Sequence, residues 1–178
     1  MRPLSVIQHY YQEGTPLYDV LVRHSRSVAD FAIDILRRHP ELNADSTFVE
    51  EAAMLHDIGI CRTQAPGIFC TGDKPYICHG TIGADMMRQE GFPRHALVCE
   101  RHTGAGLSLQ QIIEQRLPVP HRDLLPVSIE EQVICFADKF FSKTKLDRQK
   151  TPEEALRSLE KFGEEGTRRF RRWMALFL

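Results

Sequence analysis

A long stripe of apolar residues at helical spacing runs through the first part of the chain, between Pro16 and Pro40. The side chains that recur at alternating steps of four and three residues are Leu17, Leu21, His24, Val28, Phe31 and Ile35. This spacing places them on one face of an α-helix, which has to be buried against other elements. Because His24 belongs to the stripe, we expect an imidazole ring inside the core.

The remainder of the chain is divided by proline and glycine into further segments with helical spacing. Helices are predicted over residues 3–12, 16–38, 46–58, 80–90, 93–101, 108–116 and 129–144, and from residue 152 onward. No run of alternating β-branched residues predicts a strand. The predicted fold class is therefore all-α, with an irregular segment over residues 61–78 that we expect to shape a binding pocket.

Length and charge limit the class of protein. The chain has 178 residues, which fits one domain over residues 1–178. Its core is expected at about 17–145, and a C-terminal helical extension at 152–178. The 23 Lys and Arg residues against 24 Asp and Glu give a net charge of −1. This balance argues against a general nucleic-acid binder, which needs positive charge to displace counterions.

The sequence also predicts a location. No apolar run approaches the ~20 residues that span a bilayer. The first residues carry charge and glutamine where a signal peptide needs an apolar run. Five cysteines, an odd number without a Cys-x-x-Cys pair, indicate reduced thiols rather than disulfides. We therefore expect a cytoplasmic protein without a membrane partner.

The C-terminal segment combines apolar and basic residues. Its apolar positions at helical spacing are Phe170, Trp173, Met174 and Phe177, and between them lie Arg168, Arg169, Arg171 and Arg172. Such a helix can pack on its own domain, on a second copy of the chain in a homodimer, or on a membrane surface. Packing on protein, either the same chain or a second copy, is the prediction.

Histidine and aspartate also occur at other positions that are predicted to be buried. His56 follows Ala52 and Ala53 by four and three residues and is expected to point inward with them. Asp138 is surrounded by apolar residues, and an unpaired buried carboxylate costs free energy. Such a group needs a cation, a hydrogen-bond network or a metal ion that several side chains share. Imidazole and carboxylate together suit Fe, Mn, Zn, Co or Ni, although each of these residues alone could be an ordinary core or surface residue.

The order of these residues along the chain is more informative than any one of them. The pattern comprises His24, MLHDIG at 54–59, HGTIGAD at 79–85, ERHTGAG at 100–106 and EEQVICFADKF at 130–140. It resembles the HD-domain superfamily of metal-dependent phosphohydrolases, and within it the small HDIG subgroup. The resemblance covers roughly residues 17–145 and implies a helical bundle with a metal centre between core helices.

The resemblance also implies which side chains bind metal and act in catalysis. The implied ligands are His24, His56, Asp57 and Asp138 for a first divalent ion, and His79 and His102 for a second, with Asp57 bridging. Asp57, His79 and His102 are the implied catalytic residues, because two ions can activate a water and hold a phosphoryl oxygen. Members with an HDxxE motif have a glutamate that this chain lacks, so here the ions themselves would activate the water.

Cations and carboxylates near the implied centre complete the expected site. Candidates for binding substrate phosphate are Arg62, Lys74, Arg101, Lys139 and Lys143. Asp85 and Glu100 are candidates for holding the ligand imidazoles in their orientation.

The implied activity is hydrolysis of a phosphate ester or anhydride in a nucleotide-like or other small phosphorylated substrate. Two alternatives stay open, because one scaffold can carry several chemistries. HD-fold di-iron oxygenases use the same order of ligands, and a metal-stabilised binding module without turnover would need the same residues.

Overall fold

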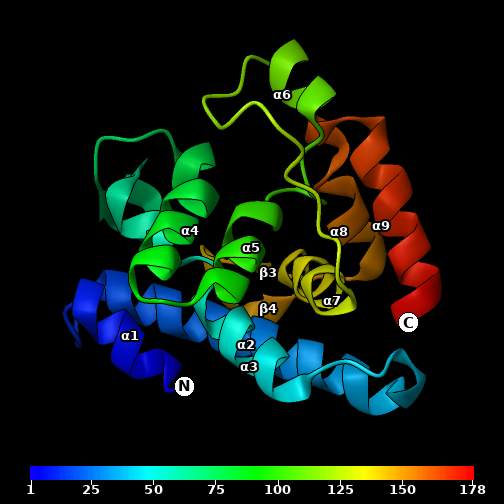
Figure 1. Ribbon diagram of the computed structural model, residues 1–178, viewed down its shortest axis with the longest axis horizontal. Helices are drawn as coiled ribbons and strands as arrows, with labels where there is room; N and C mark the ends of the chain where they lie inside the picture. Colours follow the sequence, from blue (N-terminus) through cyan, green and yellow to red (C-terminus); the bar gives the residue numbers. More distant parts are fainter.

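The computed structural model describes all 178 residues and consists mainly of helices (Figure 1). The helices are α1 (Pro3–Tyr10), α2 (Pro16–Arg38), α3 (Ser46–Leu55), α4 (His79–Gln89), α5 (Pro93–Arg101), α6 (Leu109–Glu114), α7 (Ile129–Asp138), α8 (Pro152–Arg157) and α9 (Glu164–Phe177). Two antiparallel hairpins pair β1 (Gln64–Ala65) with β2 (Cys70–Thr71), and β3 (Phe141–Ser142) with β4 (Lys145–Gln149). Single 3₁₀ turns lie at Pro40–Leu42, Ile58–Arg62, Pro66–Ile68, Tyr76–Cys78 and Glu160–Phe162. The predicted all-α class is confirmed.

Side-chain caps fix where the two central helices begin. The Thr15 side chain accepts a hydrogen bond from the Tyr18 amide at the start of α2, and Pro16 occupies the first turn. The Asp45 carboxylate accepts from the Phe48 amide at the start of α3. These contacts satisfy backbone donors that a helix cannot satisfy itself.

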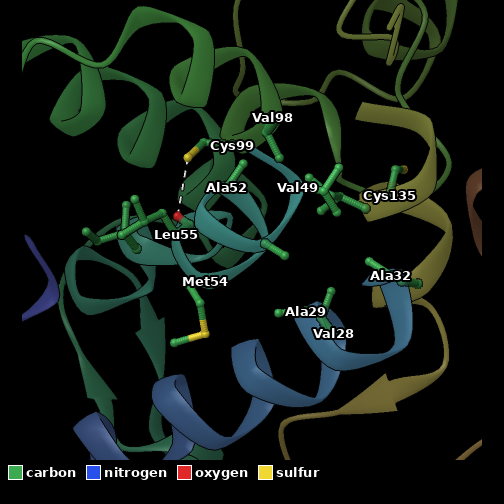
Figure 2. Close-up of a cluster of buried hydrophobic side chains, with 14 of the residues drawn as sticks. Val28, Ala29, Ala32, Val49, Ala52, Met54, Leu55, Val98, Cys99 and Cys135 are labelled. Atoms are coloured by element: carbon green, nitrogen blue, oxygen red, sulfur yellow. Dashed lines mark hydrogen bonds between the residues drawn. The ribbon is translucent and has the colours of Figure 1, made fainter. Parts of the chain in front are cut away.

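The core lies where α2, α3, α5 and α7 meet. Figure 2 shows Ala29 and Ala32 of α2 close to α3, with Val98 and Cys99 of α5 on the other side of α3. Ala29, Ala32 and Ala52 expose at most 1% of their surface. Such small side chains let helices approach closely, so α2, α3 and α7 can each bring polar groups to one point.

The apolar face of α9 is covered by the chain itself. Phe170, Trp173 and Phe177 are buried, and the rings of Phe170 and Phe177 lie 4.8 and 5.3 Å from the Phe136 ring of α7. The Trp173 indole donates to the Gln132 side chain of α7 at 3.0 Å. The stripe is therefore used in packing on the same chain. None of the helices has the combination of length and apolar character that crossing a membrane requires.

Several predicted helix boundaries differ from the structure, and two of them are wrong by more than a turn. The helix predicted to run to residue 144 ends at Asp138, because the chain turns back into the β3–β4 hairpin. The ring centroids of Phe140 and Phe141 lie 4.8 and 6.1 Å from that of Phe31 of α2. The single helix predicted from residue 152 is divided into α8 and α9 at Gly163, whose φ of 93° is outside the helical region.

Candidate metal centre

The six implied metal ligands meet in one buried cluster. Each exposes 7% of its surface or less. They come from α2 (His24), the two residues after α3 (His56, Asp57), the first residue of α4 (His79), the residue after α5 (His102) and the last residue of α7 (Asp138). The packing of five helices therefore creates the cluster.

A first group of ligand atoms contains one nitrogen each from His24 and His56 and one oxygen each from Asp57 and Asp138. The Nε2 atom of His24 lies 3.0 Å from Oδ1 of Asp138 and 3.2 Å from Oδ2 of Asp57. The Nε2 atom of His56 lies 3.0 Å from the same Asp57 oxygen and 3.3 Å from the same Asp138 oxygen. Two imidazoles and two carboxylates thus face one point.

A second group uses the other oxygen of Asp57. The Nε2 atoms of His79 and His102 each lie 3.4 Å from Oδ1 of Asp57, and 3.0 Å from each other. Asp57 therefore presents Oδ2 to the first group and Oδ1 to the second. Asp57 is thus the one residue that belongs to both groups of ligand atoms.

Backbone carbonyl groups hold three of the four ligand imidazoles in place. In each case Nδ1 lies 2.6–2.7 Å from the carbonyl oxygen three residues earlier: His56 with Ala53, His79 with Tyr76 and His102 with Cys99. A carbonyl only accepts, so each Nδ1 carries a hydrogen, and Nε2 is the nitrogen of each ring that is left to bind a metal.

The sequence-based assignment of this orienting role to Asp85 and Glu100 is wrong. Glu100 is buried and pairs with Arg88 at 2.6 Å and Arg122 at 2.9 Å, which keep its pKa low although burial opposes this. Asp85 pairs with Arg88 at 2.9 Å. Both carboxylates therefore bind arginines, and backbone carbonyl groups orient three of the ligand imidazoles instead.

The contacts within the cluster fit a metal centre. Burial lowers the pKa of His79 to about 3 and also lowers the pKa of His102, so both rings are neutral near pH 7. Their Nε2 lone pairs then face each other at 3.0 Å, a repulsive arrangement that a cation between them would relieve. Oδ1 of Asp57 is also buried without a hydrogen-bond partner.

The first group carries extra negative charge. Burial opposes protonation of His56, but the carboxylates of Asp57 and Asp138 outweigh this effect and raise its pKa to about 9. The pKa values of both carboxyl groups lie well below their usual range, because neighbouring histidines and lysines outweigh the cost of burial. Two ionised carboxylates in a buried site are what a divalent cation needs.

Gly59, in the turn after Asp57, allows the two groups to approach. A Cβ atom at this position would lie 2.2 Å from the carbonyl oxygen of His79 and 2.5 Å from the amide nitrogen of Gly83. Glycine is therefore required for the turn to pack on the start of α4. In addition, the Cys99 thiol donates to the Leu55 carbonyl at 3.4 Å, the dashed line in Figure 2, and so connects α5 to the end of α3.

A pocket of about 440 Å³ opens onto the cluster. It is lined by His79, His102 and Asp138 of the ligand set, by four lysines, and by a partly apolar wall. The lysines are Lys139, Lys143, Lys150 and Lys161. The wall comprises Tyr76, Ile77, Phe141, Leu159 and Phe162.

Two of the five predicted phosphate-binding cations lie in this pocket. Lys139 pairs with Asp138 at 2.5 Å, and Lys143 pairs with Asp57 at 2.6 Å. The other three candidates, Arg62, Lys74 and Arg101, do not line this pocket. Arg101 donates to Glu131 at 2.9 Å, and Lys74 pairs with the neighbouring Asp73. Arg62 is the last residue of the Ile58–Arg62 turn and is exposed outside the pocket.

Sequence reasoning missed Tyr76, Lys150 and Lys161. Tyr76 stacks on the His79 ring, with centroids 4.7 Å apart, and was part of the segment expected to shape the pocket. Lys150 follows the unpredicted β3–β4 hairpin, and Lys161 lies in the 3₁₀ turn between α8 and α9. No motif marks these lysines, because only tertiary packing brings them to the pocket.

Comparison with known proteins places this arrangement in a family. The HD domain matches residues 21–142, which include all six ligands. An uncharacterized protein of Methanocaldococcus jannaschii is 31% identical over 147 residues, which are 81% of this chain and 76% of that protein. A tRNA (cytidine(56)-2'-O)-methyltransferase of Thermoplasma volcanium is 35% identical over 128 residues, 71% of this chain. The chain spans only about a third of the length of that methyltransferase, with 33% covered.

The fold has a counterpart among solved structures. The HD domain of the phosphodiesterase PgpH of L. monocytogenes, in complex with cyclic-di-AMP, superposes with a TM-score of 0.53. The alignment covers 97% of this chain and 94% of that one, at 15% sequence identity. Ligand pattern, sequence match and fold agree: this chain belongs to the HD-domain family.

Proposed function

We propose that the protein is a metal-dependent phosphohydrolase with two divalent ions. His24, His56, Asp57 and Asp138 would hold one ion, and Asp57, His79 and His102 the other. The observation that carries this proposal is the position of Asp57, whose two oxygens face two separate groups of ligand nitrogens at 3.0–3.4 Å. When bound, the ions would supply a water of lowered pKa and offset negative charge on the phosphoryl group.

The lysines of the pocket support a phosphorylated substrate. Lys139 and Lys143 are buried enough to expose only 12% and 14% of their side chains, and both lie beside ligand carboxylates. Their ammonium groups would bind the non-bridging phosphate oxygens and orient the phosphorus toward the centre. The apolar wall would hold the organic part of the substrate.

The comparisons support hydrolysis to different degrees. The fold is that of a domain from a phosphodiesterase solved with cyclic-di-AMP, and family membership is established by sequence. Methyl transfer to tRNA appears in the names of relatives that are about three times as long as the matched part. The proposal therefore depends on the residues of the site, and not on the phosphodiesterase or methyltransferase activity in the names of these proteins.

Three measurements on one preparation test the proposal. Protein purified without oxygen is analysed for bound metals, then assayed with Mn or Fe against a panel of phosphomonoesters, phosphodiesters and nucleotides, and finally monitored for oxygen consumption. We expect phosphate or nucleotide release that disappears in Asp57→Asn. Lys145→Met, on the exposed face of β4, serves as the control.

The same preparation distinguishes the alternatives. Oxygen consumption without phosphate release would replace the hydrolase with a di-iron oxygenase. Bound metal and ligand without turnover of any substrate would leave a metal-stabilised binding module.

A further inference from the structure

We propose that Lys150 and Lys161 form a binding site for a second phosphate group, so that the substrate carries at least two phosphates. This inference rests on the proposed function, in which the first phosphate lies at the metal centre beside Lys139 and Lys143. The two further lysines lie beyond residue 142, where the match to the HD domain ends.

The four lysines of the pocket differ in their partners. Lys139 and Lys143 each pair with a ligand carboxylate, Asp138 and Asp57 respectively. No carboxylate pairs with Lys150 or Lys161 within the chain, whose residues are all described. The Lys150 ammonium instead donates to the Lys139 carbonyl at 3.3 Å. Two of the four positive charges therefore have no counterion.

Lys150 and Lys161 line the same pocket as Lys139. Burial lowers the pKa of Lys150, and the charges of Lys139 and Lys161 lower it further, although Asp138 and Glu154 oppose this. The only carboxylate that lines the pocket is Asp138, which belongs to the metal ligands. An anion from outside is thus the missing partner of this part of the pocket.

The distribution along the pocket gives each pair a separate role. Lys139 and Lys143 lie beside the ligands, whereas Lys161 lies at an exposed turn with its ammonium 5.0 Å from the Phe162 ring centroid. A volume of about 440 Å³ is that of a site for a nucleotide-sized molecule. Lys150 and Lys161 would hold the second phosphate at the solvent-exposed end of the pocket. The apolar wall would contact the organic part of the substrate.

The test compares probes that differ by one phosphate. Binding to the protein as purified is measured by calorimetry for AMP, for α,β-methylene-ADP and for adenosine 3′,5′-bisphosphate. The two phosphates are adjacent in α,β-methylene-ADP and separated by the ribose in adenosine 3′,5′-bisphosphate. Comparing these two probes therefore also identifies the phosphate spacing that the site accepts. Each probe is measured with the wild type, with the double variant Lys150→Met/Lys161→Met, and with the control Lys145→Met.

We expect at least one two-phosphate probe to bind the wild type roughly tenfold or more tightly than AMP, because its second phosphate would form charge-assisted hydrogen bonds with Lys150 and Lys161. The double variant should lose this preference and keep its affinity for AMP, and Lys145→Met should keep both. A preference that survives in the double variant, or a wild type without any preference, overturns the inference. Thermal melting of each variant confirms that it is folded.

Failure of the inference is distinguishable from failure of the proposed function. Hydrolysis of a one-phosphate ester without any two-phosphate preference rejects the second site alone. A lysine-dependent preference without hydrolysis of any substrate rejects the phosphohydrolase alone and leaves an anion-binding pocket.

Discussion

The ammonium group of Lys143 lies 2.6 Å from Oδ2 of Asp57, the carboxylate oxygen that faces His24 and His56. The β3–β4 hairpin makes this contact possible, because it returns the chain from the end of α7 to the ligands. Burial opposes the charged form of Lys143, but Asp57 outweighs it and raises the pKa of the lysine. A positive charge of the protein thus occupies one side of the Asp57 carboxylate.

Replacing this lysine should separate metal binding from substrate binding. In Lys143→Met we expect divalent metals to bind one to two orders of magnitude more tightly, because the competing charge-assisted contact of about 1.5–3 kcal/mol is removed. We expect kcat/KM for phosphate ester hydrolysis to fall by a similar factor. Competition with a chromophoric chelator measures the first effect, and initial rates measure the second. Unchanged metal affinity in this variant, with Lys145→Met as the matched control, would contradict this role.

Metal binding should depend on pH through His56. Its pKa of about 9 lies above the usual value of 6.5. A raised pKa means that the protonated ring stabilises the metal-free fold below pH 6.5, and that this contribution is lost as the pH rises through 9. A metal needs the unprotonated Nε2, so metal affinity should increase about tenfold between pH 7 and pH 8, with release of about one proton. Calorimetry in two buffers of different ionisation enthalpy counts that proton, and binding without proton release would refute the assignment.

The number of bound ions should follow from which ligand is removed. Asp57 belongs to both groups of ligand atoms, whereas Asp138 belongs to the first and His79 to the second. We expect the Asp57→Asn variant to lose both ions. The His79→Ala variant and the Asp138→Asn variant should each lose about one ion, because each of these substitutions leaves the other group of ligands intact. Metal analysis after dialysis gives the stoichiometry. If His79→Ala retains the wild-type metal content, only the first group binds an ion.

Gly59 should be sensitive to a single added methyl group. A Cβ atom there would be 2.2 Å from a backbone oxygen, so Gly59→Ala has to displace the turn from α4. We expect a loss of about 1–3 kcal/mol in the free energy of unfolding, or roughly 2–12 °C in Tm, together with weaker metal binding through the displaced His79. Gly67→Ala is the control, because nothing lies within 4 Å of its added Cβ. Equal melting temperatures for the two variants would refute this explanation.

The sequence predicts well that the six side chains of the cluster are buried, because local patterns determine where they lie. His24 is part of an apolar helical stripe, and His56 follows two small residues at helical spacing, so their inward direction is encoded nearby. The order of the six residues then identifies the family. The structure adds which oxygen of Asp57 faces which group, a relation that depends on five elements packing together.

The pocket is predicted less well, because tertiary packing determines it. Residues 139–150 contain no alternating pattern, and the continuing apolar residues after Asp138 predicted a longer helix. The turn at this point depends on Phe140 and Phe141 packing against Phe31, more than a hundred residues earlier in the chain. Once that turn is missed, the contact of Lys143 with Asp57 and the position of Lys150 in the pocket cannot be inferred.

The backbone contacts of His56, His79 and His102 have an evolutionary consequence. Since each ring is oriented by a peptide carbonyl of its own segment, no neighbouring side chain has to be retained to keep the ligands in register. Substitutions around the pocket mouth can therefore accumulate without dismantling the centre. Because the backbone orients these three imidazoles, related proteins can differ in the substrates that they recognise and still keep the same cluster of histidines and aspartates.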